Sequence, residues 1–224
     1  MNNKGYTKLL YKRIEEIPRG EIFVTSDFSD IADDHTIRRL LKRMVDKGDI
    51  KRISSGIYFV PKMSSILKEA VPPSPEKIAY ALARAHNWTI APSEDTALNK
   101  LGLSTQVPAV WTYVSDGPYH SRIVDGAQIS FKHVANKNIT GMSLTTLLVV
   151  QALRALGEHR IDEAAISKIQ KRLSADEVKR LVAETERSTA WIKRVVRRIV
   201  NEGKYAIDLL AKSYGLDAKE HHSG

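Results

Sequence analysis

The clearest hydrophobic pattern in the chain lies in residues 35–47, "HTIRRLLKRMVDK". Its apolar positions recur at i, i+3, i+4, i+7 and i+8, which predicts one buried face of an α-helix. These positions are Ile37, Leu40, Leu41, Met44 and Val45. Asp33 and Asp34 precede the helix, where carboxylates accept the unpaired N–H groups of a first turn, and Gly48 is a typical helix end.

The segments around this helix complete the pattern of one small domain over residues 1–62. An N-terminal helix is predicted to end at Pro18 and Gly20, and "EIFVT" predicts a short strand after it. Ser26 is placed to cap a brief second helix, "DFSDIA". The stretch "IKRISSGIYFV" predicts two short strands around a small polar tip. The order helix, strand, helix, helix, hairpin is that of a winged helix-turn-helix.

Residues 63–75 are expected to form a linker between two domains. The sequence "VPPSP" at 71–75 is incompatible with a helix interior and predicts extended backbone. We therefore expect a second domain over residues 76–212, followed by a flexible tail over residues 213–224.

The second domain is predicted to mix helices with a sheet. A helix begins at Pro75, "WTIAP" predicts a strand, and Ser93 is placed to cap a helix over "EDTALNKLG". Residues 108–134 predict three antiparallel strands, with turns at Asp116-Gly117-Pro118 and Asp125-Gly126. A C-terminal helical bundle is expected from four helical patterns, over residues 143–156, 161–172, 174–185 and 188–203. The predicted fold class is therefore α+β.

Charge then suggests a partner. The chain has 35 Lys and Arg against 26 Asp and Glu, a formal net charge of +9. Such a surplus favours an acidic partner, with double-stranded DNA as the leading candidate, although a soluble basic protein without such a partner is also compatible with it. Residues 35–62 concentrate the surplus, with eight Lys or Arg against Asp46 and Asp49.

A winged helix gives these cations a role. The face of the 35–47 helix opposite its apolar stripe presents cations to the major groove, where Arg39, Arg43 or Thr36 can contact base edges. Cations and hydroxyls of the hairpin can contact phosphates beside it. The candidate DNA-binding residues are Thr36, Arg38, Arg39, Lys42, Arg43, Lys51, Arg52, Ser54 and Ser55. Two alternatives remain open: the cationic face is merely solvated, or the module binds another protein.

The segment "LKRMVDKGDIKRISSGIYFVP" resembles the N-terminal winged helix of the antitoxins from AbiE-type abortive-infection systems. "PSPEKIAYALARAHNWTIAPSEDTALNKLGLSTQVPAVWTYVSDGP", "VVQALRALG" and "AWIKRVVRRI" are similar to later parts of that family. Asp46 departs from the pattern, since family members tend to carry a basic residue there. The resemblance implies a repressor that binds inverted repeats upstream of its own toxin–antitoxin operon. It also implies that the part after the winged helix counteracts a nucleotidyltransferase-type toxin, functionally and without a requirement for direct contact.

A second basic surface is predicted on the helix of residues 188–203. Its apolar stripe runs from Trp191 to Val200, and the cations away from it are Lys193, Arg194, Arg197 and Arg198. This face is either simply solvated, a second DNA-facing surface or a docking face for a partner. A further interpretation of a basic amphipathic pattern is a helix that lies on a membrane surface.

Nothing in the sequence predicts an enzyme, a cofactor or a metal site. There is no Cys, the seven His show no metal-ligand spacing, and no phosphate-binding glycine motif or nucleophile motif occurs. No apolar run is long enough for a signal peptide or a membrane span, so a cytoplasmic protein is expected. Two rival functions remain: a winged-helix transcription regulator with a ligand-sensing or dimerising C-terminal domain, and an interaction adaptor.

Overall fold

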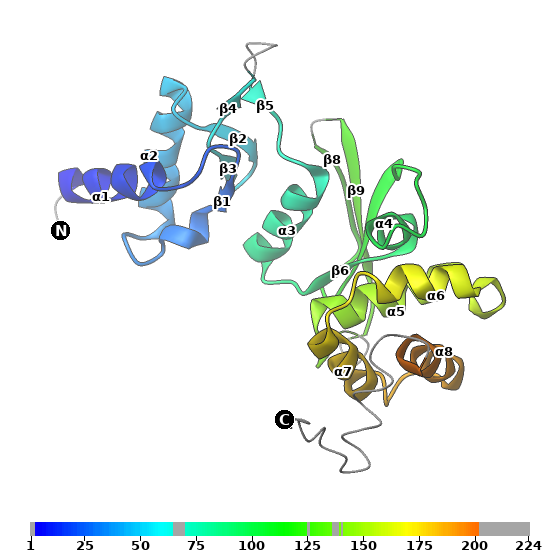
Figure 1. The fold of residues 1–224 in the computed structure, drawn as a ribbon. Coiled ribbons are helices and arrows are strands. Elements are labelled where there is room, and N and C mark those ends of the chain that lie inside the picture. The colour runs from blue at the N-terminus through cyan, green and yellow to red at the C-terminus, as the bar shows by residue number, and fades with distance from the viewer. Residues whose placement is uncertain (1–2, 65–69, 125, 136–138, 140, 202–224) are drawn as a thin grey trace, which may run out of the picture. The chain divides into compact units, whose positions relative to one another are not determined.

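The computed structural model of the chain (Figure 1) describes residues 3–64, 70–124, 126–135, 139 and 141–201. Its fold is a mixed α+β architecture of helices and several small sheets, in agreement with the predicted class. The chain divides into two compact units. The first contains Met1–Ile90 and Ala109–Val134, and the second contains Ala91–Pro108 and Ala135–Gly224. The expected linker at 63–75 therefore falls inside the first unit rather than between the two.

The N-terminal part of the first unit follows the predicted order of elements (Figure 1). In chain order these are α1 (Asn3–Glu15), β1 (Ile22–Val24), the 3-10 helix η1 (Thr25–Phe28), α2 (Asp34–Lys47), β2 (Lys51–Ser54) and β3 (Ile57–Phe59). One element differs from expectation, because a short 3-10 turn replaces the helix expected after Ser26. The Asp27 carboxylate accepts a hydrogen bond from the Val24 N–H at 2.8 Å. The turn therefore begins at Thr25, one residue before Ser26, the expected cap.

The apolar stripe of α2 is buried as the spacing predicted. Ile37, Leu40, Leu41 and Met44 are each at most 2% exposed and pack against α1, while Val45 is partly buried at the edge. Aromatic side chains close this core from the sheet side. The ring of Phe23 lies 5.5 Å from that of Phe28 and 5.8 Å from that of Tyr58. The strands β1 and β2 flank β3, and both pair with it antiparallel.

A second core joins these N-terminal elements to the rest of the first unit. Two short strands, β4 (Lys62–Met63) and β5 (Ala70–Val71), pair antiparallel and lead to α3 (Pro75–His86), which Ser74 caps. Val24 of β1 and Ile57 of β3 are each 1% exposed. Both belong to a hydrophobic cluster that also contains the apolar face of α3 and the buried residues of the strands between residues 110 and 133. Residues 1–62 therefore do not bury all of their apolar surface by themselves.

The sheet of the first unit corrects one expectation. Its strands follow the order β6-β7-β9-β8, where β6 is Ile90–Pro92, β7 is Val110–Ser115, β8 is His120–Val124 and β9 is Ala127–His133. The strand β9 lies between β7 and β8; it pairs antiparallel with β8 but parallel with β7. The predicted all-antiparallel arrangement is therefore wrong for β7.

The loop after β7 explains this topology. The loop does not form a tight hairpin, because Asp116 is hydrogen-bonded to Thr89. The Asp116 carboxylate accepts from the Thr89 N–H at 2.8 Å, and the Asp116 N–H donates to the Thr89 carbonyl at 3.2 Å. Gly117 lies against the ring of Trp88, where a Cβ atom would be only 2.4 Å away. The chain is held there and returns as β8 on the far side of β9. Of the other predicted turn, Asp125 lies outside the described residues; Gly126 has a φ of 79°, and Val124 pairs with Ala127 on either side of it.

The second unit is mainly helical. Its elements are α4 (Glu94–Lys100), α5 (Leu144–Leu156), the 3-10 helix η3 (Glu158–Arg160), α6 (Glu163–Gln170), α7 (Ala175–Glu184) and α8 (Ala190–Asn201). The strand β6 (Ile90–Pro92) carries the chain into it from the first unit. The four long predicted helices are confirmed and share one apolar core with α4. The tail expected over residues 213–224 lies outside the described residues. Among the helices that are described, none is long and apolar enough to cross a membrane.

Candidate nucleic-acid interface

The first turn of α2 is held by a side-chain cap. The carboxylate of Asp33 accepts hydrogen bonds from the N–H of Thr36 at 2.9 Å and from its hydroxyl at 2.8 Å. These bonds from the Thr36 backbone and side chain lower the pKa of Asp33, because they stabilise the ionised form. The Thr36 hydroxyl, a candidate for base contact, is therefore already engaged in the cap.

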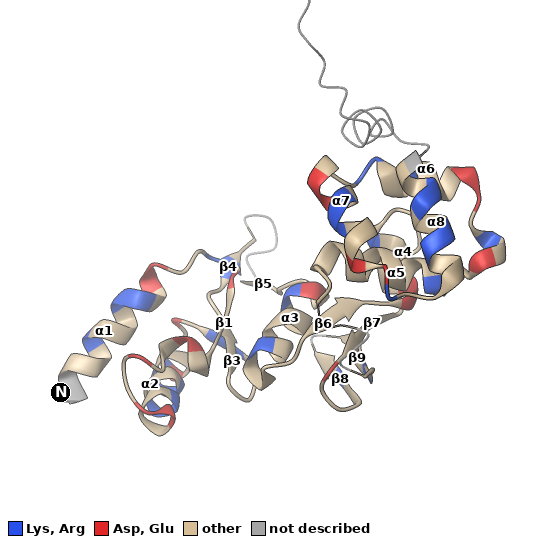
Figure 2. Ribbon diagram, turned by 90° about the horizontal axis from the view of Figure 1, so that it is seen from below, with Lys and Arg blue, Asp and Glu red and all other residues tan. Residues whose placement is uncertain are grey.

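The exposed face of α2 is basic. With the apolar stripe directed into the core, His35, Arg38, Arg39, Lys42 and Arg43 are all exposed, and Figure 2 shows the blue Lys and Arg positions along this helix. Asp46 lies on the same exposed side and adds a negative charge to it. Five of the predicted contact residues thus come from one helix, and four of them are exposed cations.

The basic face of α2 has two flanks. On one flank the guanidinium of Arg38 pairs with the Asp34 carboxylate at 2.6 Å, and its Nη1 lies 3.5 Å from the hydroxyl of Ser55 in the hairpin. On the other flank, facing α1, Lys47 donates to the hydroxyl of Tyr11 at 3.3 Å, and Arg43 borders the same small pocket. Arg38 therefore faces the hairpin, and Arg43 faces α1.

The hairpin tip is fixed by its own backbone. Gly56 has a φ of 74°, a left-handed conformation that favours glycine at this turn. Its carbonyl accepts hydrogen bonds from the Thr25 N–H at 3.0 Å and from the Thr25 hydroxyl at 3.3 Å. Behind the tip, Tyr58 and Phe59 are buried in the core. The hairpin is thus anchored on both sides of its turn.

The predicted contact residues of the hairpin separate into two groups. Lys51, Arg52 and Ser55 are exposed, although Arg52 Nε bends back to the carbonyl of Ser54 at 3.2 Å. Ser54 is different, since its hydroxyl is buried and has no hydrogen-bond partner in the described structure. A register shift between Arg52 and Ser54 turns this side chain inward. The expectation that Ser54 donates to a phosphate is therefore not supported by its position.

Three residues that the sequence did not assign to the DNA-binding site also border the hairpin tip. Ser26 of η1, His86 at the end of α3 and Arg122 of β8 line a cleft together with Ser55 and Arg38. The available signal was the alternation along β8, which places His120, Arg122 and Val124 on one side of the strand. Nothing in the sequence indicated that this side would approach the hairpin.

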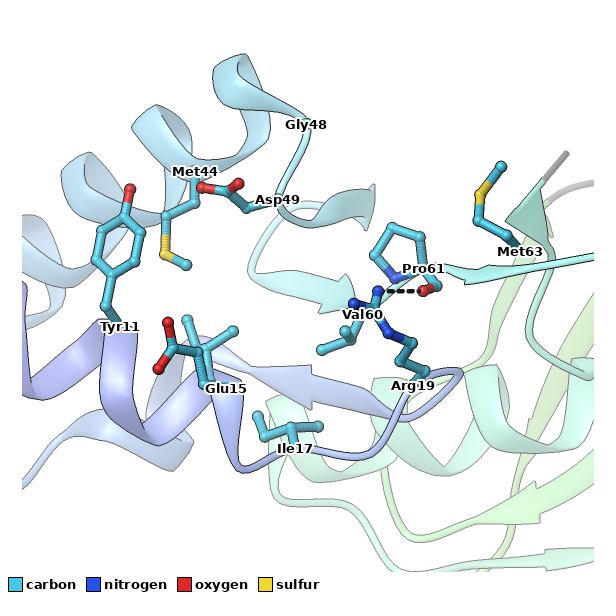
Figure 3. Close-up of a pocket in the computed structure, with 11 residues that line it drawn as sticks. Tyr11, Glu15, Ile17, Arg19, Met44, Gly48, Asp49, Val60, Pro61 and Met63 are labelled. Atoms are coloured by element: carbon cyan, nitrogen blue, oxygen red, sulfur yellow. Dashed lines mark hydrogen bonds between the residues drawn. The ribbon is translucent and has the colours of Figure 1, made fainter. Parts of the chain in front are cut away.

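A separate cavity lies elsewhere in the N-terminal part, between α1, the end of α2 and the end of β3 (Figure 3). It has a volume of about 500 Å³. Its floor is apolar and includes Met44 and Val60, while Glu15 and Asp49 bring carboxylates to it. Arg19 crosses one end and donates to the carbonyl of Pro61 at 3.3 Å. Two carboxylates make this cavity unsuitable for DNA phosphates.

The predicted second basic surface on α8 is partly neutralised. Arg194 pairs with Glu158 at 2.6 Å and Arg198 pairs with Glu163. Lys193 and Arg197 carry no ion pair within the described part of the chain. Figure 2 shows blue Lys and Arg positions on α8 between tan ones, with red positions nearby. Among the described residues, no group of three or more His, Asp and Glu side chains could hold a metal ion.

Comparison with known proteins places the sequence in a family but not in a functional class. A family model described as "Family of unknown function (DUF6088)" matches residues 9–181, which is more than half of the chain. A search of curated proteins finds no match. The family match brings no activity with it, so the geometry of the site has to indicate one.

Proposed function

Since this chain belongs to the DUF6088 family, whose function is unknown, we propose a function from the site itself: residues 1–62 act as a winged helix-turn-helix that binds double-stranded DNA. In this proposal α2 is the recognition helix, and β2, β3 and the turn between them form the wing. The observation that carries it is the 3.5 Å approach of Arg38 to Ser55, which brings the basic helix and the tip of the hairpin to one surface.

The exposed side chains divide the work of binding between phosphates and bases. Arg39, at the middle of the exposed face, is the leading candidate for a bidentate contact to guanine, with Arg43 beside it. Lys42, Lys51 and Arg52 supply cations for phosphates on either side of the groove. Each neutralised phosphate contributes about −0.9 to the slope of log affinity against log salt concentration, so binding is expected to be strongly salt-sensitive.

We further propose that the chain is the antitoxin and autorepressor of a toxin–antitoxin operon. This part rests on the resemblance of residues 41–61 and 73–118 to antitoxins of AbiE-type systems, not on the geometry of the site. Its partners are then an operator with inverted repeats and a nucleotidyltransferase-type toxin. The regions after residue 75 are assigned to toxin neutralisation.

The direct test of the DNA-binding proposal uses the DNA immediately upstream of the chain's own coding sequence. We expect the purified chain to shift this duplex in a gel in the presence of excess unrelated duplex, with an affinity that falls steeply as salt rises. Binding without any salt dependence, or no preference over unrelated DNA, contradicts a sequence-specific repressor. The antitoxin role is tested separately by co-expression with the neighbouring open reading frame: rescue of growth supports it, and continued toxicity contradicts it.

A second candidate function is a DNA-binding regulator controlled by a small molecule. The observation that favours it is the cavity beside α1 and α2, which is large enough for a small ligand and carries Glu15 and Asp49. The sequence analysis had placed ligand sensing in the C-terminal domain instead. If an amine-containing metabolite changes the affinity for the upstream DNA while co-expression rescues no growth, the regulator is the better description.

A further inference from the structure

A polar cleft of about 270 Å³ lies at the hairpin tip, between the N-terminal elements and the second half of the first unit. One wall consists of Ser26 of η1 and the turn at Ser55 and Gly56. The opposite wall consists of His86 at the C-terminal end of α3 and Arg122 of β8. All of these elements belong to one compact unit.

The chemistry of the lining favours an anion. Arg38 and Arg122 each bring a guanidinium, and Ser26 and Ser55 bring hydroxyls that can donate to phosphate oxygens. Asp34 also borders the cleft, but its carboxylate is paired with Arg38 at 2.6 Å. The second guanidinium, on Arg122, has no carboxylate partner within the described part of the chain, so the lining keeps a net positive charge.

The walls of the cleft are held in place by separate interactions. Thr25 binds the carbonyl of Gly56 through two hydrogen bonds and so fixes the turn relative to η1. The ring of His86 stacks on that of Trp88 with a centroid distance of 4.7 Å, which fixes the other wall. A cleft that is formed before binding loses less conformational entropy when it takes up a ligand.

We propose that this cleft binds a backbone phosphate of DNA beyond the wing, with Arg122 as its principal ligand. This inference rests on the proposed DNA-binding function and extends it, because α3 and β8 lie outside the 1–62 segment that the sequence assigned to DNA. The contact carries no base information. It lengthens the footprint on the side of the wing and fixes the orientation of the duplex.

The test measures affinity for the upstream duplex over a range of salt concentrations for Arg122→Gln, Arg122→Lys and a control, Lys12→Gln. Lys12 is an exposed cation of α1 and does not line the cleft. We expect Arg122→Gln to bind about tenfold more weakly at low salt and to lose about 0.9 from the salt slope. Arg122→Lys keeps the charge, so it should keep the slope and recover part of the affinity. The control should match the unaltered chain.

A second variant distinguishes loss of the phosphate contact from loss of folding. Ser26 is exposed, so Ser26→Asp adds a carboxylate to the cleft without disturbing a buried contact. It should weaken DNA binding as Arg122→Gln does, while the thermal unfolding curve stays unchanged. Equal affinities for Arg122→Gln, Ser26→Asp and Lys12→Gln overturn the cleft contact but leave the DNA-binding function standing. Failure of the unaltered chain to bind DNA overturns the proposed function itself.

A free phosphorylated molecule is the alternative source of the same chemistry. Titration with inorganic phosphate, followed by heat release, distinguishes the two. If inorganic phosphate binds the unaltered chain but not Arg122→Gln, and DNA affinity is the same for both, then the cleft serves a free anion and the DNA contact is wrong.

Discussion

The guanidinium of Arg38 lies 3.5 Å from the hydroxyl of Ser55, which connects α2 to the turn of the hairpin across 17 residues of sequence. A helix face and a loop that approach each other in this way can contact neighbouring parts of the same ligand. The ion pair between Arg38 and Asp34 is exposed, with the two side chains 47% and 64% accessible. Breaking such a pair costs little free energy, so the Arg38 guanidinium remains available to a ligand.

The first prediction concerns the exposed face of α2. Arg39→Ala combined with Arg43→Ala should remove specific binding to the upstream duplex, because one bidentate Arg–guanine contact alone contributes about 1–3 kcal/mol of discrimination. Toxin neutralisation in co-expression should persist. Gel shifts at several salt concentrations and a growth assay measure the two effects.

The control for this double variant is Lys171→Ala combined with Arg187→Ala, which removes the same charge from exposed positions of the second unit. It should bind DNA as the unaltered chain does. If the Arg39 and Arg43 variant still binds DNA and instead fails to protect cells, the two functions have been assigned to the wrong parts of the chain.

The second prediction concerns the core that joins residues 1–62 to α3. Ile57 is 1% exposed, so Ile57→Ala should lower the free energy of unfolding by about 2–5 kcal/mol. Ile123→Ala is the matched control, because Ile123 is 72% exposed and its truncation should change stability by less than about 0.5 kcal/mol. Urea unfolding at neutral pH measures both. Similar midpoints for the two variants would mean that residues 1–62 fold without help from α3.

This shared core also affects how the proposed antitoxin role should be tested. A fragment of residues 76–212 would expose the face of α3 that packs on Val24 and Ile57, and loss of activity could then come from loss of folding. The full-length chain with the Arg39 and Arg43 substitutions is the better reagent, since both side chains are exposed.

Local patterns predicted the N-terminal elements well, for a physical reason. The stripe of α2, its Asp33 cap and its Gly48 end each depend on residues no more than about four positions apart, and the structure confirms all three. The pairing of β7 depends on Asp116 reaching Thr89 and on Gly117 fitting against Trp88. Those contacts join segments distant in sequence, so no local turn signal could reveal them.

The candidate site was likewise predictable where it depends on local patterns and not where it depends on contacts between distant segments. Exposure of the α2 cations follows directly from burial of its apolar stripe. The inward position of Ser54 follows from a register shift in the hairpin, which strand alternation does not encode. Arg122 joins the site only because β8 packs near the hairpin, and this placement is a property of the tertiary fold.

The third prediction concerns pH and a cap in the second unit. Glu177 accepts hydrogen bonds from the Ser174 N–H at 2.8 Å, from the Thr145 hydroxyl at 2.8 Å and from the Ser174 hydroxyl at 2.9 Å. These bonds lower the pKa of Glu177 in the folded chain. A lowered native pKa means that the carboxylate stabilises the fold above the ordinary Glu pKa of about 4.3, and that this stability is lost as pH falls through the native pKa.

Urea unfolding at a series of pH values tests this assignment. Glu177→Gln should be less stable than the unaltered chain at neutral pH, and the gap between them should narrow as the solution becomes more acidic. Glu186→Gln is the control, because Glu186 is exposed and no hydrogen bond to its carboxylate is seen in the described structure. A gap that stays constant from neutral to acidic pH would mean that Glu177 does not act through its charge.

The last prediction decides whether α8 is a second DNA surface. Arg194 and Arg198 are held by Glu158 and Glu163, so Lys193 and Arg197 are the cations left to reach an external phosphate. Because half of the predicted surface is already paired, we expect Lys193→Gln combined with Arg197→Gln to leave the salt slope of DNA binding unchanged. A slope smaller by about 1.8, or about 0.9 for each cation, would instead place α8 on the DNA. Measuring this variant beside the Arg39 and Arg43 variant compares two charge-matched losses on two helices, which separates a specific interface from the general effect of net charge.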